Sequence, residues 1–232
     1  MKKHILFLSL FIFVFASCDE GRLYQDRLIV PEEGRVVKLH VNMSGVDTWP
    51  DGYTVVLAGF NNEKEYSLIA KSIPNNGDVD LLMAGIGEEV TSIELCVTNR
   101  IRERVYSFYT QDFSTVDTTQ LDAGTIDAGM FNAVQQGIFI GKSCVGCHGT
   151  STTAAAGLNL KEGVSYDGLV NRPSVVSPEW MRVSPGNSDE SMLYQILASP
   201  ISKEWGHDHS QEIESSIALE MLKDWIDSGA EE

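Results

Sequence analysis

The stretch GIFIGKSCVGCHGT, residues 137–150, contains the motif C-x-x-C-H at residues 144–148. Two cysteines that are separated by two residues and followed directly by a histidine can bind zinc, form a redox disulfide or attach a haem covalently. The spacing suits a haem, because both thiols can add to the vinyl groups along one porphyrin edge while His148 lies under the iron. Gly146 is expected to keep this loop tight. The sequence around the motif has to distinguish these interpretations.

The N-terminus is typical of an exported protein. Lys2 and Lys3 precede an apolar run, residues 5–15, which has the length of a signal-peptide core and is too short to span a membrane. The letters FASC, residues 15–18, resemble the cleavage box of bacterial lipoproteins, with Phe15 where leucine is usual. We therefore expect a signal peptide at residues 1–17, lipidation of Cys18 and a tether at residues 18–34. An ordinary secretory signal with an incidental cysteine is the alternative.

A lipid anchor would place the protein at a membrane surface. The acidic pair that follows Cys18, Asp19 and Glu20, resembles the start of surface-exported lipoproteins. We expect an outer-membrane lipoprotein on the periplasmic or cell-surface face, with the periplasmic face of the inner membrane as the alternative.

The composition limits the partners. The formal charge is −16 and becomes more negative when Lys2 and Lys3 are removed with the signal. A nucleic-acid backbone would be repelled, so we expect redox partner proteins, including basic ones, and no nucleic acid. Cys96 remains after Cys18 and the two motif cysteines have been assigned, and it is expected to be a buried free thiol.

Residues 35–115 have the pattern of a β domain. In VVKLHVNM, residues 36–43, apolar and polar residues alternate, and five more short runs of this kind follow, separated by turn sequences. Six strands at this spacing predict an antiparallel, immunoglobulin-like β-sandwich. The Thr-, Asp- and Gly-rich residues 116–126 are expected to be a linker.

Residues 127–232 are expected to be all-α with long loops. Apolar residues recur at helical spacing in residues 128–144, 185–199 and 210–229, and the last of these segments ends at Gly229. The motif C-x-x-C-H would therefore follow the first of three helices.

The flanks of the motif resemble those of the class I cytochrome c family. The resemblance is carried by GIFIGKSCVGCHG (137–149), AAGLNL (155–160), RVSPGNSDESMLYQIL (182–197) and MLKDWIDSGAEE (221–232). It covers residues 127–232 and implies the cytochrome c fold, one covalent haem c on Cys144 and Cys147, and His148 as an axial iron ligand. It implies nothing about the β domain.

The second axial ligand departs from the family pattern. The family usually has a Met-Pro pair some eighteen residues before the tryptophan of the last helix, and this chain has no Met-Pro pair. Counting back from Trp225 leads to His207, which predicts His/His ligation and a lower potential than His/Met ligation. His209, Met181 or an open sixth site are the alternatives. Met192 and Met221 are expected to be core residues.

Other residues are candidates for contacts with the haem. Arg172 and Arg182 are among the few cations of this region and could pair with a propionate. The expected apolar wall of the haem pocket comprises Leu158, Leu160, Leu169, Val170 and Trp180.

Zinc is the competing cofactor, because Cys144, Cys147, His207 and His209 form an acceptable set of tetrahedral ligands. A thioredoxin-type redox pair is disfavoured, since no βαβ pattern surrounds the motif.

The sequence as a whole predicts a membrane-anchored monohaem cytochrome that transfers electrons outside the cytoplasm, and no catalytic residues are assigned. Two alternatives stay open. One is a haem enzyme or small-ligand sensor with an open sixth site, and the other is a protein- or glycan-binding lipoprotein with an accessory haem domain.

Overall fold

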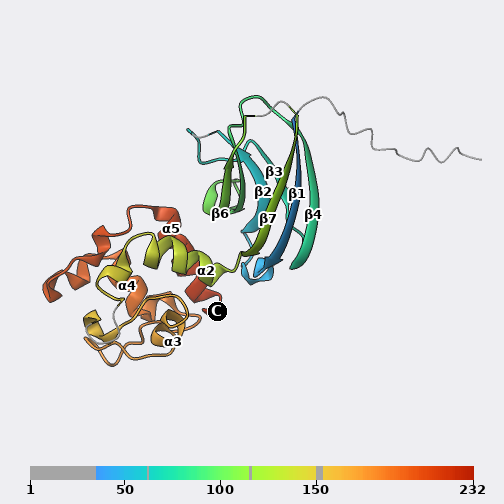
Figure 1. Cartoon of the computed structure of the whole chain (residues 1–232). Coiled ribbons are helices and arrows are strands. Elements are labelled where there is room, and N and C mark those ends of the chain that lie inside the picture. Colours follow the sequence, from blue (N-terminus) through green and yellow to red (C-terminus); the bar gives the residue numbers. More distant parts are fainter. Residues whose placement is uncertain (1–34, 62, 115–116, 150–153) are drawn as a thin grey trace, which may run out of the picture. The chain divides into compact units, whose positions relative to one another are not determined.

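A computed structural model describes residues 35–61, 63–114, 117–149 and 154–232. An N-terminal β region with two sheets, residues 35–127, precedes a small and mostly helical region, residues 130–227 (Figure 1). The expected signal peptide, Cys18 and the whole of the expected tether, residues 1–34, lie outside the described residues. Within the described residues, no helix has the length and hydrophobicity that crossing a membrane requires.

The β region contains seven strands in its described residues. They are β1 (Arg35–Ser44), β2 (Thr54–Phe60), β3 (Ile69–Ser72), β4 (Gly77–Ile86), β5 (Ser92–Thr98), β6 (Arg104–Asp112) and β7 (Thr118–Asp127). One sheet has the order β4-β1-β7 and the other has the order β3-β2-β5-β6. The six strands expected from the sequence are confirmed as β1 to β6.

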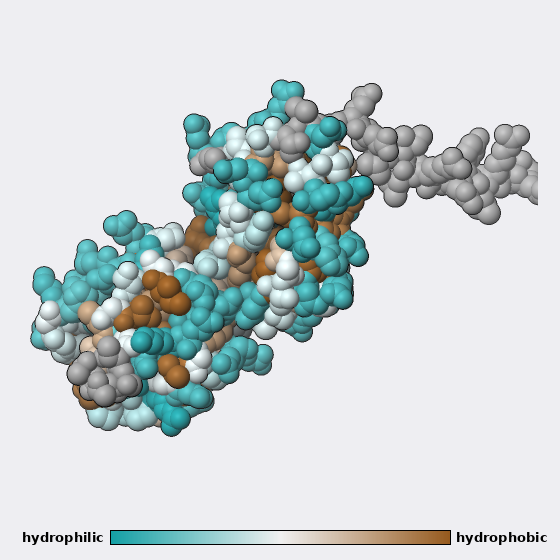
Figure 2. Space-filling view, in the orientation of Figure 1, coloured by the Kyte–Doolittle hydropathy of each residue, from teal (hydrophilic) through white to brown (hydrophobic). Residues whose placement is uncertain are grey.

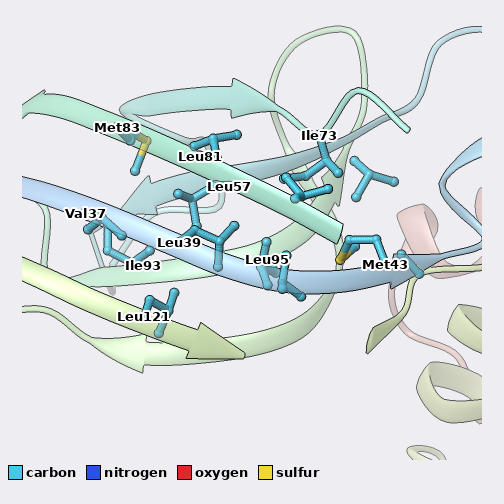
Figure 3. Packing of buried hydrophobic residues seen from close by; sticks show 14 of the residues in the cluster. Val37, Leu39, Met43, Leu57, Ile73, Leu81, Met83, Ile93, Leu95 and Leu121 are labelled. Atoms are coloured by element: carbon cyan, nitrogen blue, oxygen red, sulfur yellow. The ribbon is translucent and has the colours of Figure 1, made fainter. Parts of the chain in front are cut away.

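The alternating pattern of β1 determines how its sheet is buried. Every second side chain, from Val37 to Met43, is buried, and the residues between them are exposed or half-buried. The buried face packs against apolar side chains of the other sheet, such as Leu57 and Leu95 (Figure 3). The core of the β region therefore lies between the two sheets.

Strand β7 corrects two expectations. Residues 118–126, expected within a linker, belong to this strand, and β7 pairs with β1 in parallel, with Leu121 opposite Leu39. The prediction of an antiparallel sandwich is therefore wrong for this pair. Because β7 lies at the edge of its sheet and buries few side chains, its many Thr, Asp and Gly residues are tolerated, although they favour a loop by propensity.

The helical region is built from short helices. They are α2 (Met130–Val134), α3 (Ser165–Leu169), α4 (Met192–Ala198) and α5 (Ser216–Asp227), with 3-10 helices η3 (Cys144–Gly146), η4 (Ala155–Gly157), η5 (Ser188–Glu190), η6 (Pro200–Trp205) and η7 (His209–Gln211) between them. A π-helical segment, η2 (Gln135–Ile140), continues α2 toward the cysteine motif. Trp225 of α5 is fully buried among the apolar side chains of this region.

The third predicted helix begins later than the sequence indicated. Ser215 caps α5 by accepting a hydrogen bond from the backbone N–H of Ala218. The preceding residues form η7 instead, which Asp208 caps through the N–H of Ser210. His209 therefore lies in a short, separately capped turn.

Hydrophilic residues cover most of the visible surface, and apolar residues gather in patches on the helical region (Figure 2). Val175 and Trp205 are large apolar side chains of this region that stay exposed. Both lie at the cavity described next.

Candidate cofactor site

The motif loop is a single tight turn. Its backbone closes through hydrogen bonds from the N–H groups of Cys147 and His148 to the carbonyl oxygen of Cys144, at 3.2 and 2.9 Å. Both thiols are free, with Cys144 half-buried and Cys147 exposed. The two cysteines and the histidine are thus presented by one turn at the end of η2.

The glycine that this turn requires is Gly149. A Cβ atom on Gly149 would collide with the carbonyl group of Val145, whereas a Cβ atom on Gly146 would meet no atom of the described residues. The expectation that Gly146 keeps the loop tight is therefore corrected. The sequence offered no local signal for this difference, because it depends on how the chain folds back after His148.

The imidazole of His148 is held by a backbone carbonyl. Its Nδ1 lies 3.0 Å from the carbonyl oxygen of Ala155. Because a carbonyl oxygen can only accept, Nδ1 carries the proton and Nε2 carries the lone pair. Histidines that bind metals are commonly oriented in this way.

A cavity of about 440 Å³ opens beside the motif. This volume is within the range of pockets that bind small molecules and cofactors, roughly 300–1,000 Å³. Both motif cysteines, His148, His207 and His209 lie on its wall. The rest of the wall is mostly aliphatic and includes Ile138, Leu158, Leu160, Leu169, Leu193 and Leu197.

His209 faces His148 across the cavity. The two ring centroids are 6.2 Å apart and the rings are inclined by 39°. Two imidazoles bound in trans to one metal ion have centroids roughly 6 Å apart, since each metal–nitrogen bond is about 2.0 Å long and each centroid lies roughly 1 Å beyond its nitrogen. The observed separation of the two rings is compatible with both of them binding one metal ion placed between them.

The environment of His209 favours its neutral form. Burial, with smaller effects from His207 and His148, lowers the pKa of His209 below its ordinary value. Neutral imidazole is the form that binds a metal. The Nδ1 atom of His209 lies 3.0 Å from the hydroxyl oxygen of Ser202, so a metal would be bound through Nε2.

His207 is oriented differently. Its Nε2 is 2.9 Å from a carboxylate oxygen of Glu212, and its side chain is 60% exposed. Because a carboxylate accepts, the proton is on Nε2, the nitrogen that His209 leaves for a metal. The geometry thus favours His209 over His207 as the partner of His148.

The four proposed zinc ligands line the same cavity but are not arranged around one metal position. No group of three or more His, Cys, Asp or Glu side chains in the described residues is placed to hold a metal ion. Burial also raises the pKa of the Cys144 thiol, which disfavours the thiolate that redox exchange requires.

The other candidate residues divide between the cavity and the rest of the region. Arg182 lies on the wall and donates to the carbonyl oxygens of Gly168 and Ala156, at 2.8 and 2.9 Å. Arg172 is exposed, donates to the carbonyl oxygen of Asp167 and lies away from the wall that the structure describes.

The expected apolar wall is found in part. Leu158, Leu160 and Leu169 line the cavity, whereas Val170 packs against the core and Trp180 lies away from the described part of the wall.

The methionines divide in a similar way. Met181 is 39% exposed and lies outside the described cavity wall, while Met192 is buried and lines it. Met221 is a core residue of α5, as expected.

No model of a known protein family matches this chain, and no curated protein or solved structure is significantly similar to it.

Proposed function

We propose that this protein is an exported monohaem c-type cytochrome that transfers electrons outside the cytoplasm. One observation carries the proposal: a single apolar cavity collects two free thiols in a C-x-x-C-H turn and two imidazoles whose centroids are 6.2 Å apart. This donor set fits a covalent haem better than it fits zinc.

The residues of the chain would divide the binding between them. Cys144 and Cys147 would form the two thioether bonds, and His148 and His209 would be the axial ligands. Arg182 would face a propionate from the cavity wall. The haem iron would supply the one-electron chemistry, and the aliphatic wall would exclude water from it.

Ligation by two histidines favours electron transfer over catalysis. An iron whose axial positions are both filled by the protein would bind a substrate or a small ligand only after one of the two histidines has left it. Replacing the thioether of the family by a second imidazole also lowers the reduction potential.

A fold is proposed for each of the two regions. We infer that the helical region is a small class I cytochrome c domain, supported by the helix leading into the motif and by the buried Trp225 of the last helix. We infer that the β region is an immunoglobulin-like sandwich that spaces or docks the haem domain, supported by its two packed sheets.

The location is proposed from the sequence. Lipidation of Cys18 would anchor the protein in the outer membrane, facing the periplasm or the cell surface. We expect Cys18→Ala to move the protein from the membrane fraction to the soluble fraction, as followed by fractionation and intact mass. Retention in the membrane fraction with an unlipidated Cys18 would contradict the anchor.

Absorption spectra of the haem-loaded protein test the haem and its ligands. We expect a red protein whose ferrous form is low-spin and binds carbon monoxide slowly. His209→Ala should open the sixth site and bind carbon monoxide readily, because the remaining imidazole, His207, is held by Glu212. His207→Ala is the matched control and should keep the wild-type spectrum.

Other outcomes would overturn the proposal at different levels. A colourless protein that contains zinc would exclude the haem. Ready binding of carbon monoxide by the wild type would indicate an open sixth site, as in an enzyme or a sensor. Low-spin spectra in both histidine variants would make a methionine the ligand.

A further inference from the structure

We propose that Ser202 is the positioning residue of the second axial ligand, and that its hydroxyl group holds the ring of His209 in the orientation that iron binding requires. This inference rests on the proposed function and extends it to a residue outside the cysteine motif.

Ser202 is placed to contact His209 at two atoms. It lies in η6, is the buried residue of that helix and has no exposed surface. Its Oγ accepts a hydrogen bond from the backbone N–H of His209 at 3.0 Å and lies 3.0 Å from Nδ1 of the same residue. One buried oxygen therefore restrains both the backbone and the ring.

The hydroxyl can satisfy both donors at once. A serine oxygen has two lone pairs, so it can accept from the backbone N–H and from Nδ1–H together. A proton on Nδ1 leaves the lone pair on Nε2, which is the tautomer that binds a metal through that nitrogen. With Nε2 bound to a metal, Nδ1 would carry the proton and donate it to the Ser202 oxygen, which would fix the orientation of the ring.

The two sides of the cavity follow the same rule. The carbonyl oxygen of Ala155 holds Nδ1 of His148, and Ser202 holds Nδ1 of His209. His207 has the opposite arrangement, since Glu212 holds its Nε2. His207 and His209 are therefore distinguished by the ring nitrogen that their oxygen partner contacts, Nε2 in His207 and Nδ1 in His209.

The test measures how readily His209 leaves the iron. The rate at which carbon monoxide binds to the ferrous holoprotein is compared for the wild type and Ser202→Ala. We expect the variant to bind about 10-fold faster or more, which is the scale of effects seen when a partner of a metal ligand is removed. The low-spin EPR signal of the ferric protein should also change.

Two further variants separate positioning from packing. Ser199→Ala is the matched control. It removes a hydroxyl that donates a 2.9 Å hydrogen bond to the carbonyl oxygen of Gln195 and has no hydrogen bond with His209. It should behave as the wild type. Ser202→Cys keeps the approximate size but offers a weak acceptor, so it should resemble Ser202→Ala even if the alanine variant folds poorly.

A double variant tests whether Ser202 acts through His209. In the His209→Ala background, Ser202→Ala should add no further change in the carbon monoxide rate, since the ligand it positions is already gone. An equal effect of Ser202→Ala in both backgrounds would show a general packing role and overturn the inference.

The outcomes of these experiments distinguish a failure of the role of Ser202 from a failure of the proposed function. A protein that attaches no haem overturns both. Haem attachment with an unaffected His209→Ala variant overturns the ligand assignment and therefore the role of Ser202. An open site in His209→Ala with wild-type rates in Ser202→Ala and Ser202→Cys overturns the role of Ser202 alone.

Discussion

A buried glutamine connects the first helical segment to the loop behind the motif histidine. Gln135, at the start of η2, donates through Nε2 to the carbonyl oxygen of Leu160 at 2.9 Å and accepts from the hydroxyl of Ser165. Leu160 in turn donates its N–H to the carbonyl oxygen of His148 at 2.6 Å. A single polar side chain in the core thus supports the chain that carries His148.

We expect Gln135→Met to lower the free energy of unfolding by about 1–3 kcal/mol, because it leaves the buried carbonyl of Leu160 and the hydroxyl of Ser165 without this partner. Gln136→Met is the matched control. Its amide lies at the surface, where it bonds to Glu162, so its effect should stay within about 0.5 kcal/mol. Urea unfolding of both variants measures the difference, and equal losses would contradict the role of Gln135.

At the scale of elements, strand β7 is an edge strand that the sequence pattern does not predict. Leu121 is the buried residue of β7, and the strand is otherwise rich in Thr, Asp and Gly. Its hydrogen bonds come from β1, which is remote in the sequence, in a parallel register that needs a long crossover connection. Local propensity therefore predicted a linker where tertiary pairing makes a strand.

Leu121 distinguishes a strand from a linker at residues 118–126, because its side chain contributes to the stability of the core only in the strand. If these residues form β7, we expect Leu121→Ala to destabilise the protein by about 2–5 kcal/mol, since it empties a position in the core between the sheets. Gln120→Ala, at the exposed neighbouring position, should change stability by less than about 0.5 kcal/mol. Similar small effects of both changes on the urea midpoint would favour a linker.

The short helices of the second region depend on packing. Helices of five to seven residues, such as α2 and α4, are too short to be stable alone. The π-helical segment η2 between α2 and the motif belongs to a class of irregularity that is frequent at functional sites. The site is therefore built on turns that the core of the region holds in place.

At the scale of the whole molecule, the formal charge is −16 for the full sequence and more negative without Lys2 and Lys3, so we expect it to influence encounters with charged partners. For the haem-loaded protein, we expect a cationic redox reagent to react faster than an anionic reagent of similar potential at low salt. Raising the ionic strength should slow the cationic reagent and speed the anionic one, because the screening length falls to about 8 Å at 0.15 M. Stopped-flow measurements report both rates. A faster anionic reagent at low salt would indicate a basic patch at the reacting edge.

The sequence by itself determined the features that depend on local pattern. The alternation in residues 36–43 predicted a strand with one buried face, and six strands and a helical second region were predicted in their observed places. The motif C-x-x-C-H and its flanking sequence together predicted a haem-attachment site, because the spacing of thiols and imidazole is local and the flanks resemble those of a known family. The haem remains a prediction.

Tertiary structure decided what depends on distant partners. By sequence His207 was the predicted ligand and His209 an alternative two residues on, but in the folded chain Glu212 holds Nε2 of His207 and the buried Ser202 holds Nδ1 of His209. In the same way, β7 is a strand because β1 lies beside it. The folded chain determines which ring nitrogen of a histidine is left without a hydrogen-bond partner and which backbone segment pairs with a strand. A short stretch of sequence does not contain this information, because the partners are distant in the sequence.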